Sequence, residues 1–213
     1  MSKIDGFWPQ ALTNCVATNV YIDDDDQQLL NSLSKIDVKR NVDDLRGARI
    51  EFHFQPNDFI SDAVLVKEFK PDSEAGEFTT EFDFAADTVP VKTQINWKSD
   101  DKNLSKLKPT VGDLKENEGD EDDEEPDFEP GSFFSSFFDS ESRQVAGSIG
   151  RAIVEELFPF AIQHFKGETD DDEVFDEDED DEDDDEEDEE DEEDNDREID
   201  LEEEERPKKK GRK

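Results

Sequence analysis

Cysteine, histidine and long apolar runs are scarce in this chain of 213 residues. The single cysteine, Cys15, excludes an intramolecular disulfide, and it fits a reducing compartment. No segment approaches the roughly 20 apolar residues that a membrane-spanning helix needs, and the N-terminal residues lack the apolar run of a secretory signal. These absences predict a soluble intracellular protein that has no membrane partner.

Residue sets for metal-dependent or nucleophilic catalysis are equally sparse. The two histidines, His53 and His164, are far apart in the sequence, and no H-x-x-x-H, HExxH or CxxC spacing occurs. A pair of Cys15 with one histidine is conceivable, but two ordinary surface histidines fit the sequence better. The ten glycines are scattered and form no phosphate-binding loop. We therefore expect no enzyme activity, no cofactor and no metal site.

Calcium is a stronger competitor, because carboxylates are the ligands that Ca²⁺ prefers. The D-x-D-x-D-G loop with its distal glutamate is absent from the chain. The many carboxylates therefore predict only weak, high-capacity calcium binding without a preformed site.

Negative charge dominates the composition: 66 acidic residues against 24 basic ones give a formal net charge of −42. Every residue from Asp176 to Asp194 is Asp or Glu. Because buried carboxylates need partners or protons, this run must be solvated, extended and disordered. An extended chain advances about 3.3–3.6 Å per residue, and one DNA strand carries a charge per roughly 3.4 Å. The run therefore predicts a polyanion whose ligands are proteins that otherwise bind nucleic acid.

The charge changes sign at the C-terminal end, Arg-Pro-Lys-Lys-Lys-Gly-Arg-Lys. Such an exposed basic cluster resembles a monopartite nuclear localisation signal that an import receptor reads, and the alternative is a basic patch that folds back on the acidic run. We expect a nuclear protein, with shuttling to the cytoplasm left open. The cationic residues of the signal are Lys208, Lys209, Lys210, Arg212 and Lys213.

Apolar periodicity predicts helices over 7–18, 23–36 and 142–166. The aspartates that open the second helix suit the positive end of its dipole. Pro159 should kink or split the third helix, and Gly167 is a natural cap at its end.

Alternating apolar and polar residues predict strands over 36–42, 50–55, 63–70 and 91–98, with an additional strand around Phe82 and Phe84. Short strands joined by short turns favour an antiparallel meander. Two phenylalanine pairs within 132–138 predict a short helix whose rings fill the core. The predicted fold class is α+β: an antiparallel β-meander of about four strands with helices packed on one side.

Changes in composition divide the chain into three regions. Residues 1–167 form a predicted globular domain, which contains a flexible acidic loop at 102–130. Residues 168–206 form a disordered acidic tail, and residues 207–213 form the basic end. About 31 of the acidic residues lie between Glu168 and Glu205, while all but one of the 17 phenylalanines precede them. The domain therefore has enough aromatic residues for a modest core.

The order of several motifs resembles the nucleosome assembly protein family. The resemblance covers about residues 7–167 and the tail, and Trp97-Lys98 together with the tail favours the SET-type branch. The motifs are Phe7-Trp8, RIEFHFQPN at Arg49–Asn57, VLVKEF at Val64–Phe69, INWK at Ile95–Lys98, SFFSSFF at Ser132–Phe138 and LFPFAIQHF at Leu157–Phe165.

The resemblance implies an earmuff-like histone chaperone domain whose acidic concave underside holds histones. It implies core histones, as either or both core-histone pairs, as partners, chromatin as an indirect partner, and nucleosome assembly or disassembly as the activity. Family members usually begin with a long dimerisation helix, and here only six residues precede Phe7. A different homodimer, a monomer and a truncated form all fit this short N-terminal segment. A second departure is the stretch 71–90, which is longer than the usual hairpin.

Candidate histone contacts are acidic residues of the domain and the tail. For any one residue of the domain, an ordinary solvated helix face is an equal alternative. Thr169, followed by three aspartates, also fits an acidophilic kinase site, where a phosphate would add negative charge. The candidate contacts are Asp139, Glu141, Glu155, Glu156, Glu168, Asp170, Asp171, Asp172, Asp176 and Asp194.

Two rival functions remain open at this point. The SET-type branch is associated with phosphatase inhibition, so the chain is alternatively a protein phosphatase inhibitor or regulator. A generic acidic chaperone for ribosomal or other basic proteins is the third reading, because a polyanion alone does not select histones.

Overall fold

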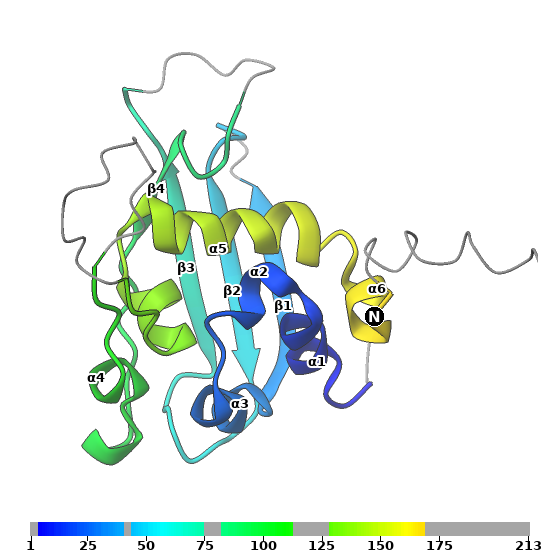
Figure 1. Ribbon diagram of the computed structural model, residues 1–213, viewed down its shortest axis with the longest axis vertical. Coiled ribbons are helices and arrows are strands. Elements are labelled where there is room, and N and C mark those ends of the chain that lie inside the picture. The colour runs from blue at the N-terminus through cyan, green and yellow to red at the C-terminus, as the bar shows by residue number, and fades with distance from the viewer. Residues whose placement is uncertain (1–3, 41–43, 75–81, 113–127, 169–213) are drawn as a thin grey trace, which may run out of the picture. The chain divides into compact units, whose positions relative to one another are not determined.

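A four-stranded antiparallel sheet organises the described part of the chain (Figure 1). The computed structural model describes residues 4–40, 44–74, 82–112 and 128–168. The strands run in the order β1-β2-β3-β4, and each pairs with the next, which confirms the predicted meander and the α+β class. Their bounds are Leu33–Arg40 for β1, Ala48–Phe54 for β2, Val64–Pro71 for β3 and Thr88–Val91 for β4.

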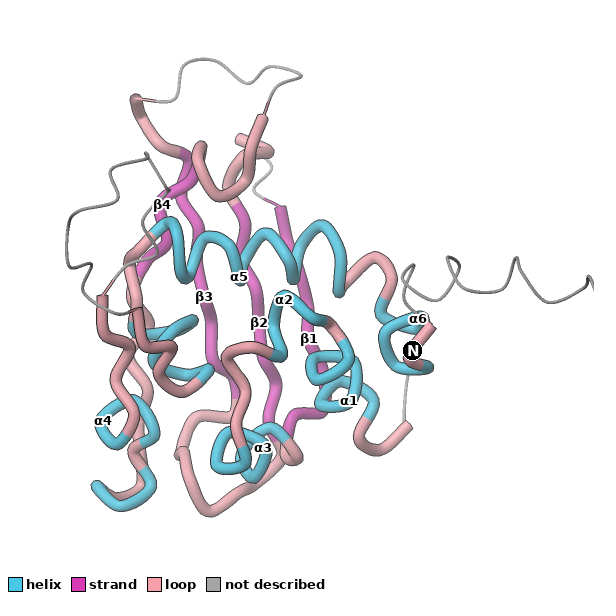
Figure 2. Tube along the Cα trace, in the orientation of Figure 1, coloured by secondary structure: helices cyan, strands magenta, loops and turns pink. Residues whose placement is uncertain are grey.

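Helices cover one face of this sheet, and α5 crosses in front of the strands (Figures 1 and 2). None of the described helices is long and apolar enough to cross a membrane. The helices are α1 (Phe7–Asn14), α2 (Val16–Asn19), α3 (Asp24–Leu30), a 3-10 turn (Asp100–Lys102), α4 (Leu104–Leu107), the Phe134–Asp139 helix, and α6 (Ala161–Lys166). The segments Arg143–Gly147, α5 (Ser148–Arg151) and Ala152–Leu157 follow one another, and together they are called the 143–157 helix.

Alternation along the strands gives the sheet one buried and one open face. In β2, Ile50 and Phe52 are fully buried, while Arg49, which precedes Ile50, faces solvent. In β3, Leu65 and Phe69 are buried on the same side. Since successive side chains of a strand point to opposite faces, the apolar set packs under the helices. Lys67 of β3 is the charged exception on that buried side.

Phenylalanine rings from the SFFSSFF segment fill the centre of the core, as predicted. The four rings of Phe133, Phe134, Phe137 and Phe138 are fully buried. The ring of Phe52 in β2 lies 5.3–6.0 Å from three of them. Full burial of one such ring contributes about 1.5–3 kcal/mol, so this cluster is a major source of stability for the sheet–helix interface.

The predicted interruption of the last helix is confirmed. The 143–157 helix ends before Pro159, a turn follows, and α6 begins at Ala161. Gly167 caps α6 with a φ of 76°, a left-handed conformation that glycine adopts without strain.

The first predicted helix is also interrupted, and its break was not foreseen. Cys15 has an extended backbone (φ −79°, ψ 110°) between α1 and α2. α1 nevertheless packs against α6: the Phe7 and Phe165 ring centroids are 4.9 Å apart, and Asn14 Nδ2 donates a 2.6 Å hydrogen bond to the His164 carbonyl. These contacts join the two ends of the described domain.

Two predicted elements are wrong in extent. The helix predicted over 23–36 ends at Leu30, because residues 33–40 pair with β2 instead of continuing the apolar helical stripe. Residues 91–98 form no fourth strand: β4 ends at Val91, and Trp97 makes only a single bridge with Ile60.

The additional strand around Phe82 and Phe84 is absent from the described residues there. Phe84 lies in a turn, where its ring packs 5.0 Å from the ring of Phe69. The predicted loop at 102–130 contains the short helix α4, which Asn103 caps by accepting a hydrogen bond from the Lys106 N–H. The period-two pattern in these segments reflects burial of single rings rather than strand pairing.

Several predictions lie outside the described residues. They concern the acidic tail, the basic end and Thr169. The boundaries at 167 and 206 stay predictions.

Candidate functional site

Charge within the described residues is much closer to balance than in the whole chain. Those residues include 23 acidic and 15 basic side chains, a net charge of about −8, against −42 for the full sequence. Most of the negative charge therefore belongs to residues outside the described ranges. A strongly polyanionic surface cannot come from the described residues alone.

The five predicted contacts of the domain come from three places in the fold. Glu155 and Glu156 are exposed on the 143–157 helix. Asp139 and Glu141 lie at the C-terminal end of the Phe134–Asp139 helix, and Glu168 follows α6. The five residues thus form two pairs and one single residue, Glu168, rather than one site. The predicted tail contacts, Asp170, Asp171, Asp172, Asp176 and Asp194, lie outside the described residues, as do the basic residues of the localisation signal.

Ion pairs already occupy two of the five residues. Asp139 Oδ1 is 3.2 Å from Lys92 Nζ, and Glu168 Oε2 is 3.3 Å from Lys166 Nζ. Within the described ranges, Glu141, Glu155 and Glu156 form no ion pair with a lysine or arginine. Exposed ion pairs contribute at most about 1 kcal/mol, so an incoming cation easily displaces the lysine from Asp139 or Glu168. It binds the other three glutamates without displacing a lysine or arginine of the described residues.

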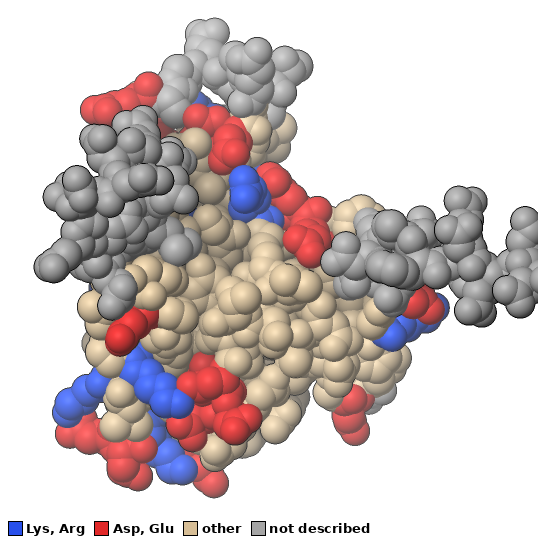
Figure 3. Space-filling view, viewed as in Figure 1, with Lys and Arg blue, Asp and Glu red and all other residues tan. Residues whose placement is uncertain are grey.

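On the helix-bearing face, the described residues form no continuous acidic patch (Figure 3). Uncharged side chains occupy its centre, and separate groups of Asp and Glu lie towards its periphery, with Lys and Arg beside several of them. Among the uncharged residues, Val16 of α2 and Val20, which directly follows α2, are more than half exposed. The acidic underside implied by the resemblance is therefore not evident on this face.

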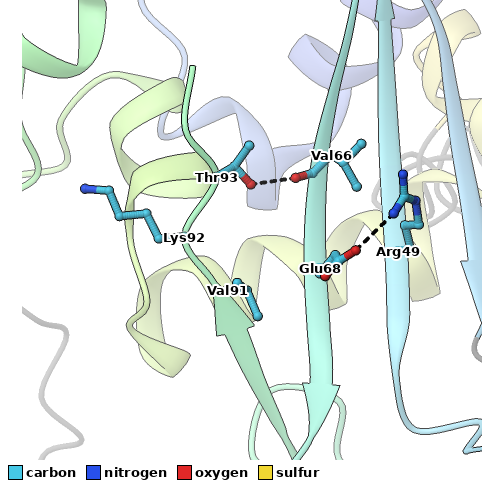
Figure 4. Close-up of a pocket in the computed structure, with 6 residues that line it drawn as sticks. All are labelled: Arg49, Val66, Glu68, Val91, Lys92 and Thr93. Carbon is cyan, nitrogen blue, oxygen red and sulfur yellow. Dashed lines mark hydrogen bonds and ion pairs between the residues drawn. The ribbon is translucent and has the colours of Figure 1, made fainter. Parts of the chain in front are cut away.

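The open face of the sheet has a small hollow that sequence reasoning missed (Figure 4). Its volume is about 260 Å³, and its floor is formed by strands β2 and β3 and the segment after β4. Within it, Arg49 Nη1 donates to Glu68 at 3.0 Å and Thr93 Oγ1 donates to the Val66 carbonyl at 2.5 Å. Side chains of both charge signs line it. The lining residues are Arg49, Val66, Glu68, Val91, Lys92 and Thr93.

Carboxylates on that open face are largely neutralised by neighbours on the sheet. Glu51 accepts hydrogen bonds of 2.9 Å from both Lys39 and Arg49, which lowers the pKa of Glu51 to about 2. Asp37 pairs with Lys35 at 2.9 Å. These side chains satisfy one another across the strands, so the open face is a weaker candidate for a basic ligand than the unpaired glutamates.

Two buried ionisable side chains hold the ends of the Phe134–Asp139 helix. Asp26 in α3 is fully buried, and its Oδ2 accepts a 2.9 Å hydrogen bond from the Phe133 N–H. Lys67 in β3 is fully buried, and its Nζ donates to the Ser140 carbonyl at 2.7 Å. An anion at the N-terminal end and a cation at the C-terminal end both complement the helix dipole.

Burial shifts both of these groups towards neutrality. It raises the pKa of Asp26 to about 7, against the opposing effect of the Phe133 N–H, and it lowers the pKa of Lys67 to about 7, against the nearby charges of Glu141 and Asp139. The sequence did signal Lys67, because it occupies an inward-facing position between Leu65 and Phe69.

A cluster of Cys15, Glu156 and His164 corrects the expectation of two surface histidines. His164 is buried in α6, with only 4% of its surface exposed. Its Nε2 lies 3.7 Å from Glu156 Oε1, and Cys15 Sγ lies 3.6 Å from the same oxygen. The fold therefore brings the sole cysteine and one histidine to a common carboxylate, which the sequence separation concealed.

Comparison with known protein families identifies the family of this chain. The family model described as "Nucleosome assembly protein (NAP)" matches residues 1–168, which is most of the chain. The chain belongs to the nucleosome assembly protein family. This membership confirms the resemblance seen in the ordered motifs.

Curated relatives within and near this family are similar over the same region. The chain is 32% identical over 168 residues to "Protein SET" of Drosophila melanogaster, covering 78% of this chain and 56% of that protein. It is 28% identical over 173 residues to "Protein SETSIP" of Homo sapiens, covering 81% of this chain and 53% of that protein. The chain thus spans about half the length of these relatives.

Solved structures share the fold at lower identity. The crystal structure of Ccp1 matches with a TM-score of 0.52 and 24% identity, covering 76% of this chain and 74% of that chain. The crystal structure of nucleosome assembly protein S from Plasmodium falciparum matches with a TM-score of 0.52 and 23% identity, covering 77% and 74%. At such identities these matches show only that the chain shares the fold of these structures.

Proposed function

We propose that this family member is a histone chaperone that binds core histones and acts in nucleosome assembly and disassembly. The observation that carries the proposal is the family match over residues 1–168 in a chain whose net charge is −42. Histones are basic and bind DNA through its phosphates, so a protein carrying a polyanionic segment competes for the same cations. Binding alone accounts for this role, without a catalytic step.

The acidic run from Asp176 to Asp194 supplies most of the affinity in this proposal. The Debye length is about 8 Å at physiological ionic strength, so many close contacts are needed and long-range attraction adds little. Duplex DNA carries about one charge per 1.7 Å, roughly twice the density of an extended acidic chain. The chaperone therefore yields its cargo to DNA when both are present.

Within the domain, Glu141 and Glu155 are the residues best placed to add selectivity. Both are exposed, and neither is paired with a lysine or arginine among the described residues. Glu156 is exposed too, but its carboxylate also contacts Cys15 and His164. Asp139 and Glu168 are secondary contacts because each must first break its ion pair with a lysine.

The basic end, Lys208 to Lys213, directs the protein to the nucleus through an import receptor in this proposal. Phosphorylation of Thr169 would add charge beside Asp170, Asp171 and Asp172. Mass spectrometry of the native protein tests this modification, and an unmodified Thr169 would argue against it.

Deletion of residues 168–205 tests the role of the tail. Histone affinity measured at several salt concentrations should fall, and the dependence of log K on log salt should become shallower, because fewer charge contacts remain. Unchanged affinity and an unchanged salt slope would refute the tail's role. An equally charged synthetic polycation serves as a second ligand, and equal binding of histones and polycation would support a generic acidic chaperone instead.

A matched pair of variants tests the domain contacts. Glu141→Gln/Glu155→Gln should weaken histone binding more than Asp58→Asn/Asp101→Asn, although each pair removes two negative charges from exposed positions. Equal effects would show that only net charge counts. A purified-phosphatase assay without histones separates the rival inhibitor function, since chaperoning alone predicts no effect there.

A further inference from the structure

Three potential metal ligands from separate helices converge beside the junction of α1 and α6. Cys15 lies at the break between α1 and α2, Glu156 lies on the 143–157 helix, and His164 lies in α6. One sulfur, one oxygen and one nitrogen of these side chains all lie within 4.8 Å of one another. Cys15 and His164 are buried, whereas the Glu156 side chain is 48% exposed. The cluster therefore has a buried base and one side open to solvent.

Within the described part of the chain, the imidazole of His164 has no hydrogen bond to either nitrogen that would prevent it from binding a cation. Its Nδ1 is buried and has no hydrogen-bond partner among the described residues, and its Nε2 is 3.7 Å from Glu156 Oε1, beyond hydrogen-bond distance. Most buried polar side-chain atoms in folded proteins have a partner. Cys15 Sγ donates a 3.6 Å hydrogen bond to Glu156 Oε1. The carboxylate therefore already contacts the thiol, and the imidazole lies beside both groups without a hydrogen bond to Glu156.

Two of the three spacings are close to those between ligands of a tetrahedral, zinc-sized ion. Typical bond lengths of about 2.3 Å to sulfur and about 2.0–2.1 Å to nitrogen or oxygen place sulfur and oxygen ligands about 3.5 Å apart, and nitrogen and oxygen ligands about 3.3 Å apart. The corresponding distances here are 3.6 Å for Cys15 Sγ to Glu156 Oε1 and 3.7 Å for His164 Nε2 to the same oxygen. These two distances exceed the ideal values by a few tenths of an ångström at most, and the sulfur and nitrogen lie within 4.8 Å of each other.

We propose that Cys15, Glu156 and His164 form a site for a thiophilic divalent cation of the Zn²⁺ class. The mixed sulfur, nitrogen and oxygen donors suit zinc better than calcium or magnesium, which prefer oxygen alone. With three protein ligands, the fourth coordination position faces the solvent beside Glu156. This inference departs from the expectation that the chain has no metal site.

Binding exchanges a proton for the metal. The Cys15 thiol loses its proton to the solvent, and the resulting thiolate forms the bond to the cation, so the net charge of the site rises by one. Metal affinity should therefore increase with pH, since deprotonation is coupled to binding.

A second candidate triad, Asp37, Glu51 and His53 on the open sheet face, fits a cation less well. Its carboxylates already bind lysine and arginine: Glu51 accepts from Lys39 and Arg49 at 2.9 Å. A divalent cation would have to displace these charges. Among the described residues, no lysine or arginine forms an ion pair with the Cys15 cluster, and the cluster includes the sulfur that gives selectivity.

Cobalt titration of the full-length protein tests the site, because Cys15 is the chain's sole cysteine. Co²⁺ bound to a thiolate shows a sulfur-to-cobalt charge-transfer band, which the carboxylates of the acidic tail cannot produce. We expect this band to appear, to saturate at one Co²⁺ per chain, and to disappear when Zn²⁺ is added. Zn²⁺ should also raise the melting temperature, because it binds only the folded chain. The reductant should be a phosphine, since dithiols bind zinc themselves.

Variants assign the ligands. Cys15→Ser should abolish the band, and His164→Ala and Glu156→Gln should each weaken Co²⁺ binding at least tenfold, while His53→Ala should bind as the parent does. The circular dichroism of each variant checks that it folds. No thiolate band in the folded parent protein, or a band that persists unchanged in both His164→Ala and Glu156→Gln, would overturn the proposal. The parent measurement decides the matter even if a variant fails to fold.

Discussion

Replacement of Asp26 by asparagine should change how the stability of the domain depends on pH. Asp26 is fully buried; its Oδ2 accepts from the backbone N–H groups of Phe133 and Asp23, at 2.9 Å and 3.2 Å, while its Oδ1 has no hydrogen-bond partner among the described residues. The negative charge is therefore only partly stabilised. Burial raises the pKa of the carboxyl from 3.8 to about 7, although Lys108 nearby acts in the opposite direction.

The size of the effect follows from the difference between these two pKa values. A difference of about 3 pKa units corresponds to about 4 kcal/mol. Between pH 4 and pH 7 the folded protein holds a proton on Asp26 that the unfolded chain releases. The contribution of this group to the free energy of unfolding therefore falls as pH rises through that interval, and it stays at its minimum above pH 7. Asparagine at this position does not titrate and has no such dependence.

Urea denaturation at a series of pH values measures the difference directly. The free energy of unfolding of Asp26→Asn minus that of the parent should become more favourable to the variant from pH 4 to pH 8, by up to about 4 kcal/mol. Asp24→Asn removes an exposed carboxylate from the same helical turn and should show no comparable trend. A constant difference between Asp26→Asn and the parent across this range would refute the assigned charge state of Asp26.

Two further substitutions follow from the core. Lys67→Met should stabilise the domain relative to the parent most below pH 7, and progressively less as the pH rises to 10.5. Burial lowers the pKa of Lys67 to about 7, so the parent regains stability as the buried ammonium loses its proton. Denaturation curves with no pH-dependent difference between variant and parent would contradict this. Gly150→Ala should cost about 1–3 kcal/mol, since its new methyl group would overlap the Phe69 ring; a melting temperature equal to that of the parent would show that the ring moves freely.

The sequence predicted the elements whose signal is local. Strict alternation in β2, Pro159 between the 143–157 helix and α6, and the positive-φ position of Gly167 depend on neighbours along the chain, and all three appear as expected. Leu33 and Ile36 misled the prediction because their spacing suits both a helix and a strand. Pairing with β2 decides between them, and that partner is not visible in a local pattern.

The candidate site was predicted less well, because its geometry depends on contacts between distant segments. Cys15 and Glu156 are 141 residues apart in sequence. The packing of α1 on α6, together with contacts of Ala152–Leu157 with α2 and α6, brings them together with His164. The acidic residues were recognised by type alone. Their pairing with Lys92 or Lys166, which separates occupied from available carboxylates, is a property of the folded surface.

The distribution of charge limits what the domain can contribute to binding a basic partner. Its described residues have a net charge of about −8, and ion pairs on the open sheet face and at Asp139 and Glu168 already use part of the acidic side chains. At a screening length of about 8 Å, a basic partner in contact with the domain senses local pairs rather than the charge of the whole chain. Attraction by net charge must therefore come mainly from outside the described residues. Within the described residues, the glutamates that form no ion pair with a lysine or arginine are the carboxylates left available to such a partner.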